Sequence, residues 1–190
     1  MNSDNPQSRE QILLALDRLR DEKLTFWADL PPNQFAAPLG DAWSPADNLR
    51  HLIKSTTPVT KALSLPPLAL RMLFGAARTP SASYVGLRDR YLAVLANGAT
   101  AGRFAPKAAR VPSDHAVWQR ELIGRCRDSA SDLRQAAARW SEADLDVYRL
   151  PHPLLGKLTL REMLFFTLYH FGHHQANVVK RMSAAVGPPN

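Results

Sequence analysis

Residues 159–185, TLREMLFFTLYHFGHHQANVVKRMSAA, decide the fold, because they carry the clearest helix signals in the chain. Thr159 and Glu162 match the Thr-x-x-Glu capping box, in which each side chain accepts a hydrogen bond from the other residue's backbone amide. The Gly-Pro-Pro run at 187–189 is typical of the end of a helix. We therefore predict a long helix that begins after Thr159 and ends near Ala185.

Three histidines lie inside this predicted helix, at His170, His173 and His174. At about 100° per residue, His170 and His174 are separated by about 40° and share a side with Met163 and Val178. We expect these two to face the interior and His173 to face outward. Two imidazoles one helical turn apart can bind one metal ion. The plainer interpretation of such a pair is core histidines that hydrogen-bond to their neighbours.

A second helix is predicted to begin after Ser44, which is a good N-cap, with Pro45 at the first helical position. It should run to about Leu63, with a disturbance at Pro58, which lacks a backbone donor. This helix carries His51 at the margin of its apolar face. His51 is the candidate third ligand, and a three-histidine site leaves positions open for water or substrate.

Apolar residues at helical spacing predict two further long helices, over 8–30 and from Ser113 or Asp114 to about Trp140. A shorter helix is expected at 84–96, between two segments rich in proline. No run of β-branched residues alternates as a strand would. Four long amphipathic helices with two long connections favour an all-α four-helix bundle.

Length and composition describe an ordinary globular protein, so we expect a single domain over residues 1–190. The chain is 45% hydrophobic and 22% charged, which excludes the disordered and fibrous classes. Its formal net charge is +7, but the basic residues are scattered rather than clustered. Binding of nucleic acid is therefore not expected, since it needs clustered Lys and Arg to neutralise phosphates.

Cys126 is the only cysteine, so the chain cannot form an internal disulfide. A lone thiol suits a reducing compartment, and we predict a cytoplasmic protein. The polar N-terminus lacks the pattern of a signal peptide, and no segment reaches the ~20 apolar residues of a membrane span, so no membrane association is expected. Cys126 falls on the apolar side of its helix, where a thiol is inert.

Two segments resemble motifs of the DinB/YfiT-like superfamily. Residues 43–52, WSPADNLRHL, are similar to the family's second-helix motif, and residues 152–175 are similar to its last-helix motif. The latter reads as a small apolar loop with Gly156, a Leu-Thr-x-x-Glu helix start, and His-x-x-x-His ending at His174. The two matches occur in the order found in the family.

This resemblance implies a four-helix bundle with an up-up-down-down course, in which His51, His170 and His174 bind a divalent metal ion, nickel or zinc. Some relatives are S-transferases or isomerases that use a low-molecular-weight thiol such as bacillithiol, mycothiol or glutathione, and relatives often form homodimers. The chain departs from smaller members in residues 65–113, which add a short helical insertion between the second and third helices. Such an insertion could cover or reshape the metal cleft.

Three hypotheses of function follow. The first is a metal-dependent enzyme that transfers a thiol to a small-molecule substrate, since a metal cation stabilises the nucleophilic thiolate. The second is a hydrolase in which the metal lowers the pKa of water to about 7. The third is a non-catalytic bundle that binds a metal or a small ligand. Asp47, Asn48 and Gln175 lie near the histidines in the sequence, but their types and positions assign them no role.

Overall fold

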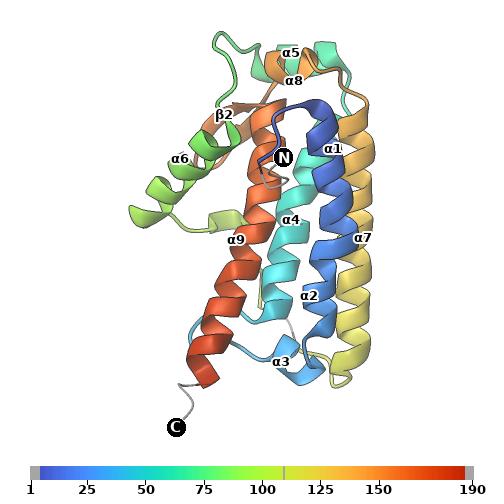
Figure 1. The fold of residues 1–190 in the computed structure, drawn as a ribbon, viewed down its shortest axis with the longest axis vertical. Helices are drawn as coiled ribbons and strands as arrows, with labels where there is room; N and C mark the ends of the chain where they lie inside the picture. The colour runs from blue at the N-terminus through green and yellow to red at the C-terminus, as the bar shows by residue number, and fades with distance from the viewer. Residues whose placement is uncertain (1–4, 109, 187–190) are drawn as a thin grey trace.

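The computed structural model describes residues 5–108 and 110–186 and shows four long helical columns packed side by side (Figure 1). The columns are α1 (Arg9–Arg18) continued by the π-helix η1 (Leu19–Lys23) and α2 (Leu24–Asp29), α4 (Pro45–Leu63), α7 (His115–Ala138) and α9 (Leu160–Val186). The shorter elements are α3 (Pro32–Ala36), α5 (Pro67–Phe74), α6 (Tyr84–Ala96), the 3-10 helix η2 (Gly102–Phe104), α8 (Asp144–Val147), and strands β1 (Arg149–His152) and β2 (Gly156–Thr159).

The predicted caps begin the two helices that carry the histidines. Ser44 Oγ accepts a hydrogen bond from the amide of Asp47 at 3.0 Å. Thr159 Oγ1 accepts from the amide of Glu162 at 3.1 Å, and Glu162 Oε2 accepts from the amide of Thr159 at 2.8 Å. These contacts confirm the expected capping box. Helix α4 continues through Pro58 to its predicted end, whereas the helix stop at 187–189 lies outside the described residues.

The directions of the four columns follow from contacts between their ends. Trp140 Nε1 donates to the carbonyl of Leu63 at 2.9 Å, so the C-terminal ends of α4 and α7 meet. Arg161 Nη1 donates to the carbonyl of Gln7 at 2.8 Å, so the starts of α1 and α9 meet. The chain therefore runs down, up, up and down in Figure 1.

The all-α class is confirmed, but this order differs from the expected up-up-down-down course. The connection over 64–114 returns along the bundle before α7 begins, so α4 and α7 are parallel neighbours. Helical periodicity shows which face of a helix is buried, but it carries no information about the direction of a long connection. The expected short helix in this connection is confirmed as α6.

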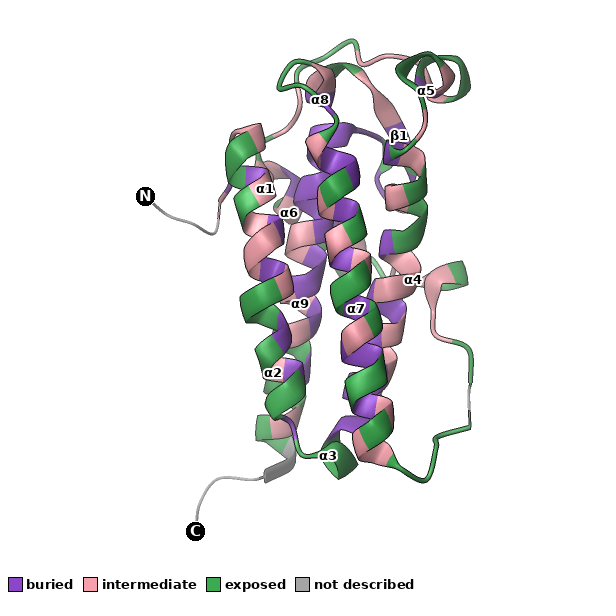
Figure 2. Cartoon of the chain, turned by 90° about the vertical axis from the view of Figure 1, so that its right-hand side faces the viewer, coloured by how far each residue is buried: buried purple, intermediate pink, exposed green. Residues whose placement is uncertain are grey.

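Two apolar clusters fill the interior, and Figure 2 shows that the buried surfaces of the columns face one another. Trp140 belongs to the cluster nearer to α8, and Trp27, Phe35 and Cys126 belong to the cluster nearer to α3. Burial raises the pKa of the Cys126 thiol to about 12. The thiol is thus protonated and enclosed, which agrees with the prediction that it packs as a small apolar group.

A small antiparallel hairpin precedes α9 and was not predicted. Arg149 pairs with Thr159 and His152 pairs with Gly156 across β1 and β2. Gly156 has a φ of 76°, which favours glycine at this turn. Each strand has only four residues, and Pro151 lies within the first. Strands this short do not show a clear alternation of apolar and polar residues.

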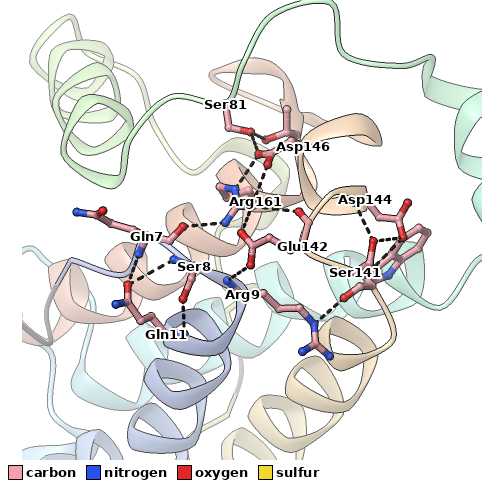
Figure 3. A network of polar contacts seen from close by, with 12 residues as sticks. Gln7, Ser8, Arg9, Gln11, Ser81, Ser141, Glu142, Asp144, Asp146 and Arg161 are labelled. Atoms are coloured by element: carbon pink, nitrogen blue, oxygen red, sulfur yellow. Dashed lines mark hydrogen bonds and ion pairs between the residues drawn. The ribbon is translucent and has the colours of Figure 1, made fainter.

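A polar network lies at the end of the bundle opposite α3, where α1 and α9 begin (Figure 3). Arg161 is only 7% exposed and donates from Nε to Asp146 Oδ1 at 2.7 Å. It also donates from Nη2 to the carbonyl and the carboxylate of Glu142. Ser81 Oγ donates to Asp146, and the amide of Arg9 donates to Glu142 Oε2 at 2.7 Å. The network thereby fixes α1, α8 and the start of α9 together.

Candidate metal centre

His51, His170 and His174 meet between two antiparallel helices. His51 lies in the second turn of α4, whose start is set by the Ser44 cap and Pro45, and the other two lie in the middle of α9. The three side chains are 4–9% exposed. Figure 1 shows α4 beside α9 along this part of the bundle. Helix α4 therefore contributes one imidazole and α9 contributes two.

The three rings direct their Nε2 atoms to one point. His170 Nε2 lies 3.1 Å from His51 Nε2 and 3.0 Å from His174 Nε2. The candidate ligand atoms all lie within 4.8 Å of one another. Nitrogens bound at about 2.1 Å to one ion are separated by roughly 3.0 Å when at right angles and roughly 3.4 Å when tetrahedral. The donor set and its spacing therefore fit a divalent ion.

Hydrogen bonds define the tautomers of two of these rings. His51 Nδ1 lies 2.9 Å from the carbonyl oxygen of Phe104, and His174 Nδ1 lies 2.6 Å from Asn48 Oδ1. The amide of Asn48 is oriented by its Nδ2, which donates to the carbonyl of Ser44 at 2.9 Å. Both partners of the rings only accept, so each Nδ1 carries the proton. The Nε2 atoms of His51 and His174 are consequently lone-pair acceptors.

This arrangement leaves His170 Nε2 between two lone pairs. One imidazole proton forms a good hydrogen bond with one of them at a time, whereas a cation at the meeting point satisfies all three nitrogens. Burial lowers the pKa of His51, burial and the neighbouring histidines place that of His170 well below its usual value, and burial lowers that of His174 to about 3. The rings are therefore neutral at pH 7, as metal ligands must be.

The structure changes the interpretation of two histidines. His51, expected at the margin of the apolar face, is only 4% exposed, because the segment around Phe104 covers it. His173, expected to face outward, is half-buried with its ring 5.8 Å from that of Tyr91 on α6. That part of the prediction was wrong, because the insertion covers a helix face that would otherwise be exposed. His173 Nε2 pairs with Asn177 and lies outside the cluster.

Asn48 and Phe104 are site residues that sequence reasoning did not assign. Asn48 lies three positions before His51, on the same side of α4, and this spacing was the available signal. Phe104 contributes a backbone carbonyl from a segment that is 53 residues away in the sequence. A carbonyl has no residue-type signature, so this contact could not be predicted from the residue pattern.

A cavity of about 390 Å³ adjoins the three histidines and is mainly apolar. Trp43 lies at one side of it, with its ring stacked on that of His174 at 6.3 Å between centroids. The insertion contributes part of the lining, including Phe74, Tyr91, Leu95, Thr100, Arg103 and Phe104. The insertion therefore covers part of the cleft beside the histidines, which is the effect that the sequence analysis expected of it.

The protein is thus a four-helix bundle with a candidate metal centre. Three neutral histidines meet at one point beside an apolar cavity. A sequence profile of the DinB superfamily matches residues 15–178, and the chain belongs to this superfamily. No curated protein and no solved structure matches the chain significantly. Within the described residues, no helix combines the length and apolarity needed to cross a membrane.

Proposed function

We propose that this protein is a metal-dependent enzyme in which His51, His170 and His174 hold one divalent ion, nickel or zinc. The proposed reaction transfers a low-molecular-weight thiol to a small-molecule substrate. The observation that carries the proposal is the convergence of three buried Nε2 atoms, two of them in the lone-pair tautomer, at the wall of an apolar cavity. Membership in the DinB superfamily supports it.

A divalent ion held there would lower the pKa of a bound thiol and so supply the thiolate nucleophile. The residues of the chain orient and enclose the reactants. Asn48 and the Phe104 carbonyl hold the rings of His174 and His51 in place. Aromatic and aliphatic side chains of the cavity exclude water from the electrophile, which disfavours hydrolysis relative to thiol transfer.

Thiol transfer is tested with a chromogenic electrophile. Metal-loaded protein is incubated with chlorodinitrobenzene and one thiol at a time: bacillithiol, mycothiol or glutathione. The thiol displaces chloride from the aromatic ring, and the thioether that forms is followed by absorbance. We expect turnover with one of the thiols, and we expect His51→Ala to abolish it without unfolding the protein. His115→Ala, a change at a half-buried histidine that contacts Asn33 and lies outside the cluster, should retain turnover.

The alternatives give other results in the same samples. A protein that binds metal but shows no transfer with any thiol would contradict the proposed reaction. Hydrolysis of a nitrophenyl ester that depends on His51 would then favour the hydrolase. Loss of thermal stability on chelation, with neither activity, would favour a metal that stabilises a non-catalytic bundle.

Asn48→Ala is expected to weaken metal binding by about 10–100-fold, as is usual when the hydrogen-bond partner of a ligand is lost. The change removes the acceptor of His174 Nδ1, so the ring can rotate or adopt the other tautomer. Metal dissociation constants are measured by competition with a chromophoric chelator. Asn177→Ala is the matched control, since this exposed asparagine contacts His173 instead. Equal affinities for all three proteins would contradict the role assigned to Asn48.

A further inference from the structure

His152 lines the cavity but is not part of the metal centre. It ends β1, is 8% exposed and lines the cavity. Its Nδ1 accepts hydrogen bonds from the amides of Leu154 at 3.2 Å and Leu155 at 3.1 Å. A backbone amide can only donate, so Nδ1 holds a lone pair. The neutral ring must therefore carry its proton on Nε2.

The Nε2–H group of His152 lies on the side of the ring away from the hairpin amides. The ring packs edge-on against Phe166, another cavity-lining residue, with centroids 4.2 Å apart. Among the described residues, no protein group forms a hydrogen bond with this Nε2. Burial lowers the pKa of His152 to about 4, so the ring is neutral near pH 7. It thus presents one N–H donor that the protein leaves unused.

Thr56 is a second polar residue at the wall of the same cavity. Its side chain is 1% exposed, and its Oγ1 is the only buried side-chain polar atom without a hydrogen-bond partner among the described residues. Buried polar atoms in native proteins almost always have a partner, so each exception needs an explanation. This oxygen is also inaccessible from the cavity, so the unused donor of His152 alone carries the inference.

The charge and size of the cavity limit the ligand further. Arg103 is the only formally charged residue among the described residues that line it, and Arg103 is exposed. Away from the proposed metal ion, the buried part of a ligand therefore meets neutral and mostly apolar side chains, which disfavours a charged group in that part of the cavity. A volume of about 390 Å³ lies in the range of pockets that bind small organic molecules.

We propose that the cavity binds an uncharged, mainly apolar small molecule through an oxygen acceptor, such as a ketone or ester carbonyl, to which His152 Nε2–H donates a hydrogen bond. This inference rests on the proposed function, because it names the substrate class of that enzyme. His152 then fixes where the carbonyl lies relative to the three histidines.

The test compares acetophenone with ethylbenzene, which have the same ring and chain length but differ in one carbonyl oxygen. Binding of both probes is measured by NMR titration on metal-loaded and on chelator-treated protein. In His152→Asn, the Asn oxygen can still accept from the hairpin amides, as in an Asx turn, while the donor is withdrawn from the cavity. We expect the ratio of acetophenone to ethylbenzene affinity to fall about threefold to tenfold, the size of one neutral hydrogen bond.

His115→Asn is the matched control and should leave this ratio unchanged. An unchanged ratio in His152→Asn, or an equal loss of affinity for both probes, would overturn the inference. A second measurement needs no variant: the imidazole Nε2–H resonance of His152 in the wild type should move further downfield with acetophenone than with ethylbenzene, because only acetophenone accepts its hydrogen bond. Failure of this response in protein that holds metal refutes the inference alone. A normal response in protein that binds no metal refutes the proposed function alone.

Discussion

Replacing His170 with Ala is expected to abolish stoichiometric metal binding, whereas the wild type should hold one equivalent of nickel or zinc per chain. His170 Nε2 is the atom that lies within 3.1 Å of both other ligands, so its removal leaves two nitrogens without a central partner. Changes that affect only the partners of ligands weaken metal binding by about 10–100-fold, so loss of a ligand should exceed that. Elemental analysis of protein purified without a metal-binding tag measures the effect.

His173→Ala is the control for this experiment, because His173 lies on the same helix but outside the cluster. It should retain the metal content of the wild type. Circular dichroism of each variant shows whether the bundle is intact. Full metal content in His170→Ala, or absence of metal from the wild type even after reconstitution, would refute the three-histidine centre.

Replacing Arg161 with Ala is expected to lower the free energy of unfolding by about 2 kcal/mol, within the range for the loss of hydrogen bonds between charged groups. The Arg161 side chain is 9% exposed and bridges Asp146 and Glu142, which are themselves about half exposed at 41% and 55%. Its loss leaves both carboxylates and the Gln7 carbonyl without their donor. Urea denaturation at neutral pH measures the change.

Arg20→Ala is the matched control, since Arg20 forms an ion pair with Asp21 at the surface. Exposed pairs contribute about 0–1 kcal/mol, because water screens the charges. A change in Arg161→Ala no larger than that in Arg20→Ala would show that the network in Figure 3 contributes no more than a surface pair. A large loss in Arg161→Ala alone would support its role in joining the ends of α1, α8 and α9.

The helices could be predicted because their signals are local. Ser44 and Thr159 begin α4 and α9 through contacts within three residues, and the spacing of apolar residues identified the buried face of each helix. His170 and His174 were assigned to one interior face for the same reason. The hairpin before α9 and the parallel course of α4 and α7 were not predicted, because both depend on the path of connecting segments.

The residue pattern was sufficient for the helical class, for the capped starts of α4 and α9, and for the interior positions of two histidines, since each depends on neighbours within one or two helical turns. Tertiary packing was needed to bring His51 to those histidines, to place the Phe104 carbonyl on its ring, and to turn His152 toward a cavity. These features join segments tens of residues apart. Their positions depend on how loops and helices pack, which periodicity does not encode.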